Sequence, residues 1–124
     1  MSYKLTINGK LDNLNDYIDS CRTNQYKGSK VKNHNENIVK RAIYEQLGRI
    51  RISNPVYMTY RWYEPDRRRD LDNISSFGRK VIQDALVDTH VLKNDGWKEI
   101  KGFRDEFYID KKNPRIEVEI EVVD

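Results

Sequence analysis

Apolar side chains recur at helical spacing in three segments of the chain. In residues 36–47 aliphatic residues repeat every four positions, and Gly48 follows as a C-terminal stop signal. Residues 73–88 carry apolar side chains at the i, i+3, i+4, i+7 positions of an amphipathic helix. A shorter pattern of the same kind covers residues 12–21. The spacing therefore predicts two main helices and one short helix.

Apolar and polar residues alternate in the segments that we expect to be strands. The alternation spans residues 56–64, and residues 116–122 place isoleucine or valine between successive glutamates. Less regular patterns predict strands at residues 3–7 and 97–109, the second bent at Gly102. Helices interspersed with hairpin-like strands indicate the α+β (α/β) class, with a small mixed sheet packed against the two main helices.

Other features of the sequence limit the number of domains and the cellular compartment that we expect. The polar segment 28–37 has no apolar period, and we expect it to be a mobile loop. No repeat or shift in composition divides the chain, so residues 1–124 are expected to form a single domain. A run of about 20 apolar residues and an apolar signal core are both absent. Cys21 suits a reducing compartment and is expected to be buried. We therefore expect a cytoplasmic protein with no membrane partner.

Charge is unevenly distributed along the chain, although the net value is only +3. Residues 1–69 contain 14 Lys or Arg against 7 Asp or Glu, a net of +7. Residues 70–124 contain 9 against 13, a net of −4. The two halves can neutralise each other in the fold, or they can lay a basic anion-binding surface around an acidic pocket.

The segment Arg-Arg-Arg-Asp-Leu-Asp-Asn at residues 67–73 combines three arginines with two carboxylates after a predicted strand. In an extended segment Asp70 and Asp72 point the same way, about 7 Å apart. At that spacing they repel each other unless a cation lies between them, and Mg²⁺ prefers such oxygen ligands. The alternative is a charged loop before a helix, with Asp72 as the N-cap and the arginines in solvent.

The predicted helix after this motif carries a polar stripe. At about 100° per residue, Asn73, Lys80 and Asp84 lie on one side, and the stripe begins at the carboxylate pair. The alternative is an ordinary Lys80–Asp84 surface pair at i, i+4 spacing. A third acid, Asp95, lies in a turn sequence, where it is either a turn former or an acid that returns to the carboxylate pair.

These features follow one another in an order that is typical of a known family. In chain order they are the basic run 67–69, the DxDN motif 70–73, Lys80 four residues before Asp84-Ala85-Leu86, and the turn Asn94-Asp95. Over about residues 60–100 the series resembles the RusA family of Holliday-junction resolvases, which are small bacterial and phage-borne endonucleases. Two departures are visible. Asn94 stands where the family often has a second acid, and the interval from Asp72 to Lys80 is about one helical turn longer.

The resemblance implies a Mg²⁺-dependent, structure-selective DNA endonuclease, with Mn²⁺ as a substitute ion, that resolves four-way junctions in recombination and repair. It implies a RusA-like fold, an intertwined homodimer, and a bacterial cell in which the gene is chromosomal or carried by a prophage. The site residues that it implies are the catalytic and metal-binding Asp70, Asp72 and Asp95, the catalytic Lys80, and the supporting Asn73 and Asp84.

Basic and aromatic side chains are the candidates for DNA contact. The basic ones are Arg67, Arg68 and Arg69. A weaker patch, whose alternative is a solvated surface, consists of Lys27, Lys30, Lys32, Lys40 and Arg41. The aromatic ones are Tyr57, Trp62, Tyr63 and Trp97, for which the sheet core or a dimer interface is the favoured role. Strand 56–63 in particular is a candidate for the dimer interface, because it carries more large side chains than one small core readily hides.

Two other functions fit part of the sequence. A non-catalytic DNA-binding recombination accessory protein would keep the basic residues, but it has no need for repelling carboxylates among its arginines. A structural module that binds protein partners would show no Mg²⁺ dependence and no affinity for branched DNA. The complete set of three acids favours the enzyme.

Overall fold

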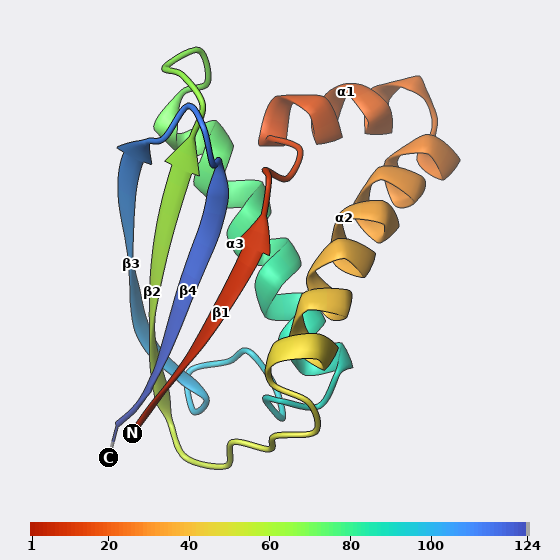
Figure 1. Ribbon diagram of the computed structural model, residues 1–124. Coiled ribbons are helices and arrows are strands. Elements are labelled where there is room, and N and C mark those ends of the chain that lie inside the picture. Colours follow the sequence, from red (N-terminus) through yellow and green to blue (C-terminus); the bar gives the residue numbers. More distant parts are fainter. Residues whose placement is uncertain (124) are drawn as a thin grey trace.

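The computed structural model describes residues 1–123, in which three helices lie on one side of a four-stranded sheet (Figure 1). In chain order the elements are β1 (Ser2–Asn8), α1 (Leu14–Thr23), α2 (Gln25–Gln46), β2 (Val56–Glu64), α3 (Leu71–Asp88), β3 (Ile100–Ile109) and β4 (Arg115–Val122). α3 packs against the sheet, and α2 contacts both α3 and β1. This architecture confirms the predicted α+β class with a mixed sheet.

The sheet has the strand order β1-β4-β2-β3. β2 and β3 run parallel and are connected through α3, whereas β4 pairs antiparallel with both β1 and β2. β3 and β4 follow each other in the chain, but β2 lies between them in the sheet. The expected hairpin-like arrangement is therefore wrong for this pair. As a further consequence, β3 forms one edge of the sheet.

The core lies between the helices and the inner face of the sheet, with β2 at its centre. The alternate residues Val56, Met58, Tyr60 and Trp62 are almost completely buried there. β2 also has β4 on one side and β3 on the other, so neither of its edges is free. The inner aromatic side chains of this strand thus belong to the core of the chain, which is one of the two roles favoured for Trp62. A part for strand 56–63 in a dimer interface stays a prediction.

α3 approaches β2 most closely at Gly78. A Cβ atom at this position would lie 2.6 and 2.7 Å from two ring carbons of Trp62. The indole itself is held in place, because its Nε1–H donates to a carboxylate oxygen of Asp105 on β3 at 2.9 Å. Arg79 donates to the other oxygen of Asp105 at 3.1 Å. These contacts tie α3, β2 and β3 together.

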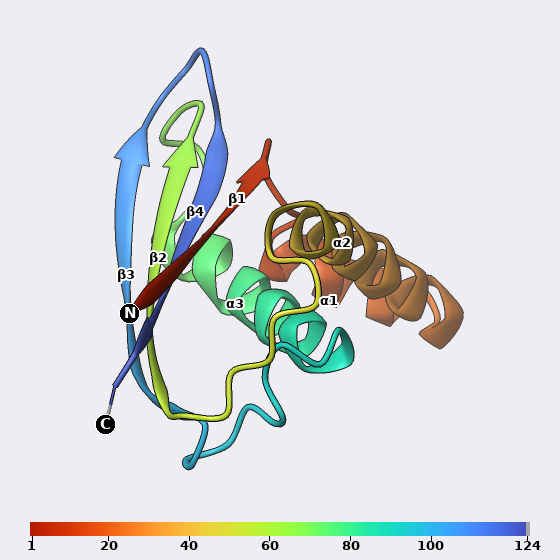
Figure 2. The ribbon, with the colours of Figure 1, turned by 60° about the horizontal axis from the view of Figure 1, so that its bottom comes forward.

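α2 includes residues 28–37, so the loop expected there is wrong. Asn24 caps the helix, since its side-chain oxygen accepts from the backbone N–H of Lys27 at 2.7 Å. Gly28 allows α1 to pack closely, because a Cβ there would lie 2.5 Å from Sγ of Cys21. Figure 2 shows α1 and the beginning of α2 extending away from the sheet. Residues 28–37 show only a weak apolar stripe, because few of these residues face the core.

One sequence expectation about the surface is wrong. Cys21 is exposed rather than buried, and α1 has no fully buried residue. Among residues 1–123, no helix combines the length and the apolar character that crossing a membrane requires.

We predict that Gly78→Ala destabilises the fold by about 1–3 kcal/mol, because the added methyl group overlaps the held indole of Trp62. The loss should exceed the gain of about 1 kcal/mol that Ala brings to a helix interior. Denaturant unfolding measures the difference. Gly96→Ala is the matched control, since its Cβ would meet only the flexible side chain of Glu99 at 3.4 Å. Equal effects of the two substitutions would contradict the close packing of α3 on β2.

Candidate active site

Asp70 and Asp72 lie where the chain passes from the arginine run into α3. Asp70 is the N-cap, with φ −69° and ψ 148°, and its side chain makes no capping hydrogen bond. Asp72 lies in the first turn, so the alternative in which Asp72 is the N-cap is wrong. Both residues are exposed, and neither carboxylate has an ion-pair or hydrogen-bond partner within residues 1–123. The positive end of the helix dipole favours negative charge at this position.

The neighbouring arginines do not neutralise these two carboxylates. Arg68 forms an ion pair with Asp66 at 3.6 Å, and its side chain is 89% exposed. Arg69 is directed toward Glu64 at 3.5 Å, and both of these side chains are largely buried. Arg67 is exposed and forms no ion pair in the part of the chain described. Arg67 and Arg68 are therefore accessible to a phosphate, whereas Arg69 belongs mainly to the interior.

Lys80, Asp84 and Asp95 lie together further along α3. The Nζ of Lys80 is 3.2 Å from Asp84 Oδ1 and 3.7 Å from Asp95 Oδ2. The second oxygen of Asp84 is 3.3 Å from the Nζ of Lys32 on α2. The hydrogen bond to Asp84 and the charge of that carboxylate raise the pKa of Lys80. Lys80 is therefore a protonated amine at neutral pH.

The two groups of residues are separate in the single chain. Asp72 and Lys80 are eight residues apart, which corresponds to about 12 Å along a helix axis. The alternative in which Asp95 returns to the carboxylate pair is not realised in the single chain, because Asp95 meets Lys80 on α3 instead. Among residues 1–123, no three His, Cys, Asp or Glu side chains are grouped so that they could hold a metal ion. The Mg²⁺ site formed by all three acids thus stays a prediction that the single chain does not assemble.

A cavity of about 350 Å³ adjoins the second group. It is lined by Lys32, Glu36, Lys80, Asp84, Val87, Asp88, Asn94 and Asp95. Sequence reasoning missed Glu36, which is 8% exposed and whose pKa is raised by burial, against the opposing charges of Lys32 and Lys40. A signal was present, because Glu36 stands three residues before Val39 on the apolar side of the helix.

The weaker basic patch is only partly available for DNA. Lys27 and Lys30 are exposed on α2 and line a shallow cavity with Asp12 and His34. Lys32 points instead to Asp84. Among the aromatic candidates, Trp62 is 1% exposed and lies in the core, whereas Trp97 is 95% exposed. These positions leave Lys27, Lys30 and Trp97 as surface candidates.

Comparison with known proteins gives one informative match. The family model described as Endodeoxyribonuclease RusA matches residues 12–121 of the 124-residue chain. The match covers both groups of site residues and all elements of the fold except β1, which lies before it, and the last residue of β4. A search of curated proteins finds no significant match.

We predict that Glu36→Gln raises stability at neutral pH, because Gln avoids the burial of a charged carboxylate. Burial raises the pKa of Glu36 above its ordinary value of 4.5, so the native state favours the protonated acid. The wild type should therefore lose stability, relative to the variant, as pH rises from the unfolded pKa through the higher folded one. Thermal unfolding at pH 3.5 and pH 7.5 tests this, with exposed Glu45→Gln as the control on the same helix. If Glu36→Gln raises stability equally at both pH values, the burial of a charged carboxylate is not the cause of the gain.

Proposed function

The chain belongs to the RusA family of endodeoxyribonucleases, and we propose that it resolves four-way DNA junctions by hydrolysing phosphodiester bonds beside α3. The observation that carries the site assignment is the pair of exposed carboxylates Asp70 and Asp72, which have no partner within residues 1–123. Two adjacent unneutralised acids favour the binding of a cation. Arg67 and Arg68 stand beside them as exposed groups for the phosphates on either side of the cut.

We propose Mg²⁺, with Mn²⁺ as a substitute, as the ion that Asp70 and Asp72 attract. Mg²⁺ is commonly held by one or two carboxylates, together with water and substrate phosphates, so the donor types suit it. When bound, such an ion neutralises phosphate charge and activates water. Asp95 is the third proposed ligand, but in the single chain it contacts Lys80 instead. It reaches the other two acids only in an assembly that brings separate parts of α3 together.

Lys80 is the proposed source of positive charge at the reacting phosphate. It is protonated at neutral pH, and its side chain is 60% exposed, so it can donate to a phosphate oxygen or to the leaving oxygen. Asp84 holds it in place from the next turn of the helix. Asn73 lies one residue after the acid pair and is partly exposed, which suits a supporting role.

We propose a homodimer as the active form. A four-way junction has two strands to cut in a symmetric way, and one chain carries one set of acids, so a two-fold dimer supplies the second set. The large apolar side chains of the edge strand β3, rather than those of β2, are exposed in this chain. Phe103 is 48% exposed, Tyr108 42% and Ile109 49%. Sedimentation should therefore give about twice the 14.8 kDa of one chain.

We predict that Asp70→Asn or Asp72→Asn lowers junction cleavage by at least about 10²-fold, while junction binding is retained or tightened. The substitution removes a cation ligand and also a repulsion toward DNA phosphates. Cleavage of a labelled four-way junction and of a linear duplex, with Mg²⁺ and with a chelator, measures the effect. Exposed Asp19→Asn on α1 is the control. Wild-type cutting rates in both variants would refute the assignment, and a wild-type protein that binds junctions without cutting them would favour the accessory-protein alternative.

We predict that Lys80→Ala lowers the single-turnover cleavage rate by about 10²-fold or more, with little change in thermal stability. An exposed pair such as Lys80–Asp84 contributes only a few tenths of a kcal/mol to folding. Lys80→Arg should restore the rate only in part, because a planar guanidinium presents its donors differently. If Lys80→Ala cuts a preassembled junction complex at the wild-type rate, Lys80 is a surface ion-pair residue.

A further inference from the structure

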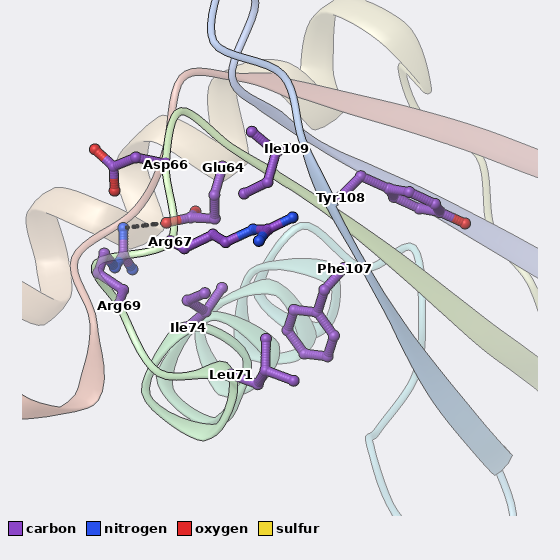
Figure 3. A pocket seen from close by; sticks show the side chains of 9 residues that line it. All are labelled: Glu64, Asp66, Arg67, Arg69, Leu71, Ile74, Phe107, Tyr108 and Ile109. Carbon is purple, nitrogen blue, oxygen red and sulfur yellow. Dashed lines mark ion pairs between the residues drawn. The ribbon is translucent and has the colours of Figure 1, made fainter.

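A separate pocket of about 450 Å³ opens where β2 and β3 end and α3 begins (Figure 3). It is lined by Glu64, Asp66, Arg67, Arg69, Leu71, Ile74, Phe107, Tyr108 and Ile109. The lining residues Arg69 and Leu71 stand on either side of Asp70 in the chain. The pocket is therefore next to the proposed reacting carboxylates, although none of the proposed catalytic residues lines it.

The lining combines apolar walls with balanced charges. Leu71, Phe107 and Ile109 supply exposed or partly exposed apolar surface. The charged lining consists of two arginines and two acids, so its formal charge sums to zero. Such a site suits a neutral ligand with flat apolar faces and polar groups at its edge. A phosphate fits less well, because Glu64 and Asp66 would oppose its charge.

The ion pair in this pocket is incompletely satisfied. The side chains of Arg69 and Glu64 are only 14% and 7% exposed, yet their closest atoms are 3.5 Å apart. The Nε of Arg69 is buried and has no hydrogen-bond partner in the described chain. A buried ion pair is a poor means of stabilising a fold, and an unpartnered buried N–H lowers stability further. These two charged groups are therefore better explained by a ligand that completes their hydrogen bonding.

We propose that this pocket receives one unstacked nucleobase at the exchange point of the four-way junction. This inference rests on the proposed function, since it assumes that DNA lies across Asp70. A base has two apolar faces, which Phe107 and the guanidinium of Arg67 can contact. The edge of a base carries hydrogen-bond donors and acceptors. Glu64 can accept from the donors, and Arg69 can donate to the acceptors. Bases at the exchange point cost less to unstack than bases within an arm, because the continuous stack of each arm ends there.

Phe107 provides the sharpest test, and Phe103 is its matched control. Both side chains lie on the inner face of β3, four residues apart, but only Phe107 lines the pocket. Junction affinity is measured in chelator for the wild type, Phe107→Ala and Phe103→Ala. Each protein is titrated with an intact junction and with junctions that carry one abasic residue at successive exchange-point positions.

If the pocket holds a base, the effect of Phe107→Ala on junction affinity should depend on whether that base is present. Phe107→Ala should weaken binding to the intact junction by roughly 5-fold or more, and should have no effect once the accommodated base is absent. Phe103→Ala should affect all junctions equally. An equal effect of Phe107→Ala on every junction, or no effect on any, overturns the proposal. A loss of the dimer in Phe107→Ala also overturns it, because the pocket is then part of the contact between two copies.

A measurement on the wild type alone covers the case in which Phe107→Ala fails to fold. With 2-aminopurine at the same exchange-point position, binding should raise the fluorescence and shield the base from acrylamide. A rise without shielding means that the base is unstacked but not enclosed, which overturns the proposal. If the wild type cuts junctions but shows neither coupling nor shielding, only the pocket inference fails. If it neither binds nor cuts junctions, the proposed function fails with it.

Discussion

The contact between Trp62 and Gly78 positions α3, the helix on which Asp72, Lys80 and Asp84 lie. The indole fits against the backbone of α3 only because Gly78 has no side chain. The same indole is bound to Asp105, which also accepts from Arg79, the residue after Gly78. The helix is thus fixed to two parallel strands at one point. Its first turn then presents the acid pair at the end of β2, and its later turns present Lys80 and Asp84 to α2.

Charge pairing between the two halves of the chain explains which basic residues remain available for contact with DNA. Lys32 and Lys40 on α2 lie 3.3 Å from Asp84 and Asp88 on α3. Other basic side chains of the first half are paired within the sheet, as Arg61 is with Glu106 and Glu119. Of the two arrangements that the uneven charge allowed, mutual neutralisation is seen in these pairs, and it removes Lys32 from the proposed DNA contacts. Arg67, Arg68, Lys27 and Lys30 remain exposed, at the start of α3 and on the projecting part of α2.

Sequence patterns predicted the elements better than their arrangement. The strand at 56–64 and the long helix ending at Asp88 were predictable, because a face buried against one core imposes a clear period. The first part of α2 was not, since it packs mainly on α1 and needs only a few apolar positions. Strand order was also hidden, because alternation shows that a strand has a buried face without identifying its neighbour. The sequence also left open whether Asp95 only forms a turn or returns to the carboxylate pair, and it did not indicate the contact with Lys80 on α3.

The arrangement of Lys80 shows how a protonated lysine can still act on a substrate when neighbouring carboxylates balance its charge. In the single chain its charge is balanced by Asp84 and Asp95, so a DNA phosphate must compete with both carboxylates. Asp84, however, holds a second lysine on its other oxygen, because Lys32 lies 3.3 Å away. If Lys80 turns toward DNA, Lys32 keeps Asp84 neutralised, and of the two carboxylates only Asp95 loses its contact with an amine. Lys80 is also the most exposed member of this group, so its movement disturbs the least packing. The ion pairs with Asp84 and Asp95 therefore keep the protonated amine of Lys80 beside the proposed substrate path and still allow it to move.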